Sequence, residues 1–265
     1  MKKTPLSFSK LGFLTAAMVI FTAVPIHTTE ILLSERRSTY EQMSRETRAM
    51  QDEDSANPGM LWVLDGEALW RTKAGETNRA CANCHGDAQK SMKGVAARYP
   101  AYDDKHKRAV DLEGRINLCR SEQQKAPPFV YESRELLALT ALIARQSRGM
   151  PIESKDERLQ SFIESGHELF NRRQGQLNLS CVQCHNDNWG KKLAGIALPQ
   201  AHPTGYPLYR LEWQALGSLQ RRLRNCMIGM RMETYDYGSP EYIALETYLM
   251  WRARGMMMES PAVRP

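Results

Sequence analysis

The sequence predicts an all-α fold in which two homologous halves follow each other along the chain. Three stretches, at residues 133–146, 159–170 and 239–252, carry apolar side chains at helical spacing. Few segments alternate between apolar and polar residues, the pattern typical of a half-buried strand. Related motifs recur about 100 residues apart, so we expect tandem domains at residues 31–150 and 151–265.

The ends of the predicted helices are also marked in the sequence. Ser239 is a suitable N-cap for the helix that follows it, and Pro240 stands at a first helical position, where it is well tolerated, while Ser133 and Glu135 stand near the start of the helix at 133–146. The helix at 159–170 begins the second half of the chain. These elements support the helical interpretation independently of the apolar pattern.

The N-terminus has the order of charge and hydrophobicity found in secretory signals. Lys2 and Lys3 precede an uncharged apolar run at residues 11–24, which is shorter than the ~20 residues of a membrane-spanning helix. We therefore expect residues 1–30 to be a signal peptide, or else an N-terminal anchor, and the rest to be periplasmic with no integral membrane role. Removing Lys2, Lys3 and Lys10 lowers the formal charge from +6 to +3, which gives no argument for a nucleic-acid partner.

Four of the six cysteines belong to two copies of Cys-x-x-Cys-His, the attachment motif of c-type haem. The first copy is Cys81, Cys84 and His85, and the second is Cys181, Cys184 and His185. Two thiols one helical turn apart can each bond a haem vinyl group, and the adjacent His then reaches the iron. A thioredoxin-like pair or a zinc site explains these motifs less well, because each copy carries the His and they lie 100 residues apart. The sequence thus predicts two covalently bound haem c groups and two tandem cytochrome c domains.

Further repeated features surround these motifs. Each half has Gly-x-x-Leu-aromatic before the motif, at 66–70 and 166–170, and Arg-Gly-Met near its end, at 148–150 and 254–256. The segments directly after each motif are rich in Gly, Pro and charged residues, and we expect them to be loops around the haem. Each of these segments is followed by a single cysteine.

The second axial ligand of each haem is not fixed by the motifs. The methionines and histidines that could serve are Met92, Met150, Met227, Met230, Met256, His106, His167 and His202. Cys119 and Cys226 occur once per half in arginine-rich contexts, which favour a thiolate. They could alternatively form one disulfide. The hypothesis favoured by the repeat is that His85 and Cys119 bind one iron, and that His185 and Cys226 bind the other.

The sequence resembles the SoxA family of the SoxAX cytochromes over most of its length. The resemblance depends on the paired haem motifs, on Arg115-Ile-Asn-Leu-Cys119-Arg120, and on the stretch from Tyr209 to Cys226. It implies that Cys226 ligates the second haem as a persulfide and that Arg222 lies in the active site. It also implies haem-dependent coupling of thiosulfate to a cysteine of the SoxYZ carrier, a mono-haem SoxX-like subunit, and an electron-accepting cytochrome.

The residues themselves are compatible with this function but leave rivals open. Arg221, Arg222 and Arg224 form a cationic cluster that suits a dianion, and Lys191 and Lys192 are possible additions. The same cluster also fits a solvated helix face or a docking surface. A di-haem electron carrier without bond chemistry is the main alternative, and a di-haem peroxidase fits less well because each haem motif has its own cysteine.

Overall fold

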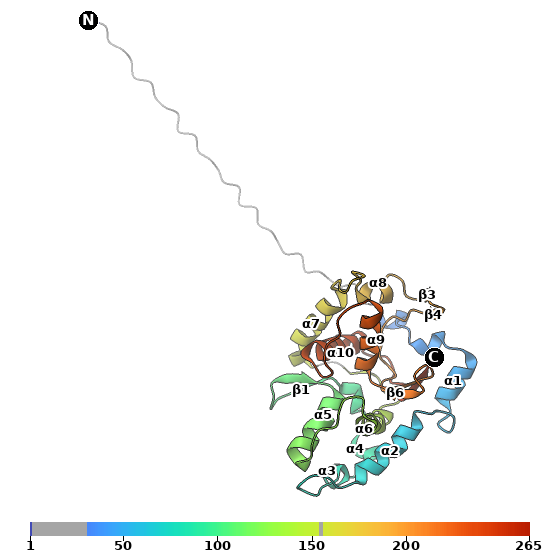
Figure 1. The fold of residues 1–265 in the computed structure, drawn as a ribbon, viewed down its shortest axis with the longest axis vertical. Coiled ribbons are helices and arrows are strands. Elements are labelled where there is room, and N and C mark those ends of the chain that lie inside the picture. Colours follow the sequence, from blue (N-terminus) through green and yellow to red (C-terminus); the bar gives the residue numbers. More distant parts are fainter. Residues whose placement is uncertain (2–30, 154–155) are drawn as a thin grey trace. The chain divides into compact units, whose positions relative to one another are not determined.

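The computed structural model describes Met1 and residues 31–153 and 156–265, and this part of the chain is mainly helical (Figure 1). The α-helices are α1 (Arg45–Asp52), α2 (Met60–Arg71), α3 (Cys81–His85), α4 (Ala88–Ser91), α5 (Leu112–Cys119), α6 (Arg134–Arg145), α7 (Gln160–Asn171), α8 (Cys181–His185), α9 (Leu219–Gly229) and α10 (Pro240–Arg252). The strands are β1 (Ala101–Asp103), β2 (Arg108–Val110), β3 (Lys192–Leu193), β4 (Ile196–Ala197), β5 (Leu208–Arg210), β6 (Ala215–Gly217) and β7 (Ala262–Arg264). The predicted signal peptide lies outside the described residues apart from Met1.

The three helices predicted from apolar spacing are present as α6, α7 and α10. The Ser133 hydroxyl accepts a hydrogen bond from the Leu136 amide at 3.3 Å, and Ser239 accepts one from the Tyr242 amide at 3.3 Å. Both serines are therefore N-caps, which confirms the prediction for Ser239. Pro240 is the first residue of α10, where its missing N–H leaves no unmade hydrogen bond.

The repeated Gly-x-x-Leu-aromatic motifs lie where two helix pairs come together. Helix α2 packs against α6, and α7 packs against α10. A side chain at Gly66 would collide with the carbonyl oxygen of Ala138, and one at Gly166 would collide with that of Ala244. Glycine is therefore required at both positions, because only a hydrogen in place of Cβ allows these helices to approach so closely.

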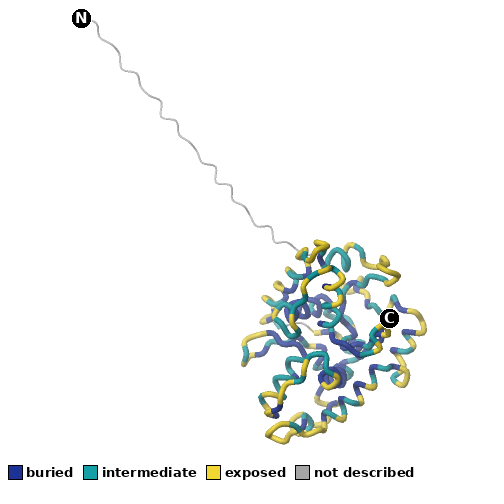
Figure 2. The backbone as a smooth tube through the Cα atoms, viewed as in Figure 1, coloured by how far each residue is buried: buried dark blue, intermediate teal, exposed yellow. Residues whose placement is uncertain are grey.

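The buried side chains form two hydrophobic clusters, one around each helix pair. The first is built mainly on α2 and α6, and the second on α7 and α10. Figure 2 shows α6 and α10 among the most continuously buried segments. Residues 31–265 nevertheless group as one compact unit, so the predicted boundary near residue 150 stays a prediction.

The segments expected to be loops after each haem motif contain regular elements instead. An antiparallel hairpin joins β1 to β2, and a three-stranded sheet has the order β6-β5-β7. Strands of two or three residues are too short for the period-two pattern on which a prediction relies. The lone cysteines also lie on helices, since Cys119 ends α5 and Cys226 lies within α9.

Residues 149–152, which begin inside the first Arg-Gly-Met segment, pair with residues 255–258, which begin inside the second. The Gly149 amide donates to the Met258 carbonyl at 2.8 Å, and the Met258 amide donates to the Met150 carbonyl at 2.9 Å. The parallel pairing of β5 with β7 brings the chain's C-terminal strand to the second half's hairpin. Across residues 31–153 and 156–265, no helix has the length and hydrophobicity to cross a membrane.

Candidate functional site

Each Cys-x-x-Cys-His motif forms one short helix that begins at the first cysteine. The Ala80 amide donates to the Asn83 side chain at 2.8 Å before α3, and the Ser180 amide donates to Gln183 at 2.8 Å before α8. The second residue between the two cysteines, Asn83 or Gln183, thus caps the N-terminus of its helix. This helical turn places the two thiols about one turn apart, which is the spacing that thioether bonds to haem require.

The first motif borders a cavity of about 280 Å³ that reaches across to α5. Cys81, Cys84 and His85 line one side of it, and Cys119 lines another. The remaining wall is formed by Trp70, Arg79, Ala80, Met92, Val95, Tyr99, Leu112, Arg115, Ile116, Arg120, Gln123, Gln124, Leu139 and Ile143. The structure therefore brings the predicted attachment residues of the first haem together with the first lone cysteine.

The second motif borders a cavity of about 270 Å³ that reaches α9. His185, Arg222 and Cys226 line it, together with residues from the N-terminal segment and from β7. Cys181 and Cys184 lie close enough to Cys226 for its charge to raise the pKa of both thiols, in addition to the larger effect of burial. The predicted attachment residues, His185 and the second lone cysteine are thus also gathered at one place.

The residues around the second cavity fit a haem group. The His185 Nδ1–H donates to the Pro199 carbonyl at 2.7 Å, which leaves Nε2 as the nitrogen that can bind iron. Burial holds the pKa of His185 below its usual value, so the ring is neutral, as a metal ligand must be. Leu219, Leu223 and Leu249 supply the apolar wall that a porphyrin needs.

The structure separates the candidate axial ligands. The six cysteines are not joined by disulfides, so Cys119 and Cys226 remain available at their own cavities. Among the other candidates, Met92 lines the first cavity and His202 lines the second. Met227 instead accepts a hydrogen bond from Tyr242 at 3.4 Å. Burial raises the pKa of Cys119 although Arg115 opposes this, so the thiolate expected there depends on binding to iron.

The three arginines before Cys226 have different surroundings. Arg221 lies 3.8 Å from Glu132 and stacks on Trp213. Arg224 donates to the Tyr235 carbonyl. Arg222 lines the second cavity, and no acidic side chain of the described residues forms an ion pair with it. Among the three, Arg222 has a guanidinium that is available to an anion beside Cys226.

Sequence reasoning missed two arginines of the second cavity, whereas His202 was already among the candidate axial ligands. Arg210 and Arg264 line it from β5 and β7, and His202 lines it with a buried Nε2 that has no hydrogen-bond partner in the described protein. The His202 Nδ1–H donates to the Arg37 carbonyl at 3.1 Å. Burial lowers the pKa of His202 to about 4, so this ring is neutral at pH 7. The pairing of β5 with β7 brings Arg264 here, and nothing in the local sequence indicates that pairing.

Lys191 and Lys192, suggested as additions to the arginine cluster, lie apart from it at the β3–β4 hairpin. Both lysines are exposed, and Lys191 Nζ donates to Asn188 at 2.8 Å. The hairpin itself reaches the second cavity through Ile196 and Ala197. The two lysines therefore stand at the surface near the cavity rather than on its wall.

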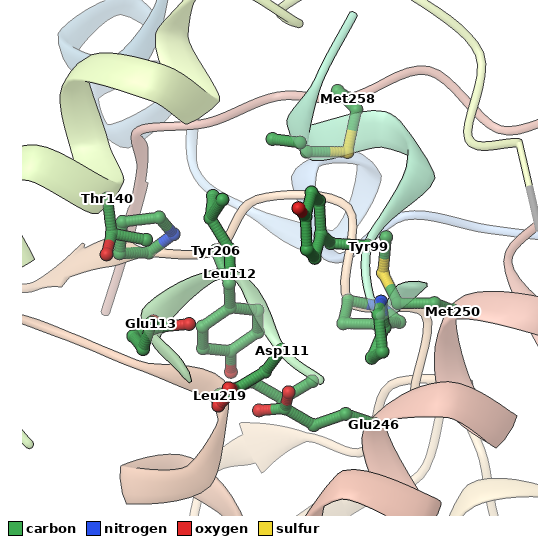
Figure 3. Close-up of a pocket in the computed structure, with 14 residues that line it drawn as sticks. Tyr99, Asp111, Leu112, Glu113, Thr140, Tyr206, Leu219, Glu246, Met250 and Met258 are labelled. Carbon is green, nitrogen blue, oxygen red and sulfur yellow. The ribbon is translucent and has the colours of Figure 1, made fainter. Parts of the chain in front are cut away.

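A third cavity, drawn in Figure 3, shares lining residues with each of the two haem cavities. Tyr99 also lines the first haem cavity, and Tyr206 also lines the second. Asp111, Glu113 and Glu246 contribute carboxyl groups to its wall. Burial raises the pKa of Asp111 to about 6 and, together with Asp111, that of Glu113 to about 8. This cavity holds acids that resist ionisation and is unsuited to an anion.

Comparison with known proteins gives a consistent picture. The family model described as "SoxA/TsdA, cytochrome c domain" matches residues 65–152 and 165–258. The chain is 41% identical over 221 residues to the L-cysteine S-thiosulfotransferase subunit SoxA of Pseudaminobacter salicylatoxidans, covering 83% of this chain and 77% of that protein. It is 36% identical over 231 residues to the SoxA subunit of Rhodovulum sulfidophilum, covering 87% and 80%.

A solved structure is also similar. The crystal structure of SoxXA from P. pantotrophus superposes with a TM-score of 0.83 and 32% sequence identity, covering 87% of each chain. The predicted all-α cytochrome c fold is therefore confirmed, with small β-hairpins added to it. A cytochrome c domain binds its haem covalently through the motifs described above.

Proposed function

We propose, from the premise that this chain belongs to the SoxA family of c-type cytochromes, that it couples thiosulfate oxidatively to a cysteine of a SoxYZ-type carrier protein. The related subunits are named for L-cysteine S-thiosulfotransferase activity. The observation that carries the proposal is the position of Cys226 and Arg222 on the wall that also holds His185, with no acidic side chain of the described residues paired to Arg222. A sulfur, a cation and a haem-binding residue then face one cavity.

The chain is proposed to hold two haem c groups, in domains at residues 31–150 and 151–265. Cys81 and Cys84 would bind the first haem covalently, and Cys181 and Cys184 would bind the second. The axial pairs would be His85 with Cys119, and His185 with Cys226. Support comes from the two cavities, each of which has its own haem motif and its own lone cysteine on the wall or next to it.

The reaction joins a carrier thiol to thiosulfate and releases one proton and two electrons. In balanced form, R–SH and S₂O₃²⁻ give R–S–S–SO₃⁻, H⁺ and two electrons. Haem, when bound, supplies the one-electron acceptor for this oxidation. Arg222 would bind the sulfonate end of thiosulfate through charge-assisted hydrogen bonds and direct its outer sulfur toward Cys226. Among the sulfur atoms of this chain, that of Cys226 would lie closest to the bond formed between the carrier thiol and thiosulfate. Cys226 would carry a persulfide in part of the molecules.

Partners and location follow from the same assignment. The two electrons need an exit, and a mono-haem SoxX-like subunit with an electron-accepting cytochrome would provide it. The similarity to a SoxXA structure supports the first of these. The carrier protein and thiosulfate would be met in the periplasm, to which residues 1–30 would direct the chain.

A di-haem electron carrier without bond chemistry is the alternative. A carrier needs haem ligands and a docking surface, but it has no use for an unpaired guanidinium beside a cysteine inside a cavity. Arg222 therefore favours the conjugating enzyme over the carrier.

The test uses the purified haem-loaded complex with its partner subunit, thiosulfate, the SoxYZ carrier and an electron acceptor. Intact mass spectrometry of the carrier should show the addition of one thiosulfate only when the complex is present. A carrier mutant without its thiol is the matched control and should gain nothing. An unmodified carrier, despite rapid exchange of electrons between the complex and the acceptor, would refute the proposal and favour the electron carrier.

A further inference from the structure

The two haem cavities are built on equivalent hairpins whose residues can be matched one to one. Strand β1 pairs with β2 so that Asp103 faces Arg108, and β5 pairs with β6 so that Arg210 faces Ala215. The turns also match, because Lys107 and Gln214 both have positive φ, at 53° and 49°. The hairpin is followed in each half by the helix that carries the lone cysteine. Asp103 and Arg210 thus hold the same place in the two halves.

In the first half, this place is occupied by a buried carboxylate that neutralises an arginine. Asp103 Oδ2 lies 2.5 Å from an Arg115 nitrogen, and Arg115 lines the first cavity four residues before Cys119. Although burial opposes ionisation, hydrogen bonds from His106 and Arg115 hold the pKa of Asp103 well below its usual value. Asp103 is therefore ionised at neutral pH, and the positive charge of Arg115 is compensated inside the protein.

In the second half, the same place carries the opposite charge. Arg210 is 7% exposed and lines the second cavity, as does Arg222, which stands four residues before Cys226. The acid that pairs with Arg210 is Glu212 at 2.8 Å, whose side chain is 63% exposed. Within residues 31–153 and 156–265, Arg222 thus has no counterpart to the Asp103 carboxylate.

The segment that contains the hairpin and the lone cysteine is also more positively charged in the second half than in the first. Residues 99–119 contain four cationic and four acidic side chains, a formal net charge of 0. Residues 206–226 contain four cationic side chains and one acidic side chain, a net charge of +3. A dianion is attracted by uncompensated guanidinium groups in a partly buried site and is repelled by a buried carboxylate.

We propose that the residue at this hairpin position, Asp103 in the first half and Arg210 in the second, determines which of the two haem cavities accepts thiosulfate. Asp103 closes the first cavity to anions by pairing with Arg115. In the second cavity, Arg210 places a cation at this position, so that no carboxylate there neutralises Arg222 and thiosulfate can bind. Arg210 is in this sense a specificity-determining residue. The inference rests on the proposed function, since it names the residues that direct thiosulfate to Cys226.

The experiment measures thiosulfate binding to the haem-loaded complex without the carrier protein. Calorimetry gives the number of thiosulfate ions bound per complex, and ferric EPR shows which haem signal they shift. The variants are Asp103→Asn, which keeps an acceptor for His106, and Arg210→Gln. Asp104→Asn is the matched control, because the exposed Asp104 side chain is next to Asp103 in sequence and forms its ion pair with Arg158 at the surface.

Wild type and Asp104→Asn should bind one thiosulfate and shift the second haem. Asp103→Asn should bind a second thiosulfate that shifts the first haem. Arg210→Gln should weaken binding at the second haem by roughly tenfold or more, the effect of losing a charge-assisted contact, with full haem content. Wild-type binding in either variant would overturn the proposal. A loss of haem in Arg210→Gln without weaker thiosulfate binding would also overturn it, because Arg210 would then be a haem-binding residue and not a residue that selects thiosulfate. No shift of the second haem in wild type would refute the proposed function itself.

Discussion

Replacing Arg222 with alanine should lower the activity with thiosulfate by an amount that can be worked out from the structure. Arg222 lines the second cavity beside Cys226 and has no carboxylate partner among the described residues, so its charge is available to thiosulfate. Removing one charge-assisted hydrogen bond costs about 1.5–3 kcal/mol. At about 1.36 kcal/mol per decade, kcat/KM for thiosulfate should fall roughly tenfold to a hundredfold.

The assay is thiosulfate-dependent modification of the carrier by the haem-loaded complex, with haem content measured for each variant. Arg222→Lys keeps the charge without the planar fork and should recover part of the activity. Arg224→Ala is the control on the same helix, since Arg224 is already held by the Tyr235 carbonyl and by the Tyr237 ring. If Arg222→Ala and Arg224→Ala lose equal activity at full haem content, the assignment of Arg222 as the anion-binding residue is wrong.

Three further expectations concern the cofactor, its ligands and the buried acids. A pyridine haemochrome assay on the isolated chain should give two covalent haems, and a ratio near one would contradict this. Cys119→Ala and Cys226→Ala should each remove one thiolate-type low-spin ferric EPR signal, and unchanged spectra would show that other residues are the axial ligands. Burial and the neighbouring Asp111 raise the pKa of Glu246 in the folded chain. The folded chain therefore loses stability relative to the unfolded chain as pH rises above about 4, the ordinary pKa of a glutamate. Glu246→Gln should therefore raise the free energy of unfolding relative to wild type at pH 8, and should raise it less at pH 5. Denaturant unfolding at the two pH values measures this difference, and equal effects at both would show that ionisation of Glu246 is not the cause.

Much of the site could be predicted because its chemistry is local in sequence. The haem motifs form single helical turns, so Cys181, Cys184 and His185 are placed relative to one another by the spacing alone. The repeat then linked each motif to one later cysteine. The helices α6, α7 and α10 were predicted because each is long enough to show an apolar period.

The remaining features depend on contacts between distant segments. Arg264 reaches the second cavity only because β7 pairs with β5. Asp103 and Arg210 are equivalent through the register of hairpins whose strands are three residues long, which give no periodic signal. Met150 was a possible ligand by sequence, but its backbone pairs with Met258 where the two halves meet. The helical position of Cys119 and Cys226 was likewise hidden in segments expected to be loops.

We propose that the second cavity, with Cys226, performs the conjugation and that the first does not. The decisive measurement compares Cys226→Ala with Cys119→Ala in carrier modification, at equal haem content and with the partner subunit bound. We expect Cys226→Ala to abolish modification almost completely and Cys119→Ala to retain most of it. Loss of modification in Cys119→Ala together with full activity in Cys226→Ala would contradict the account and move the active site to the first cavity.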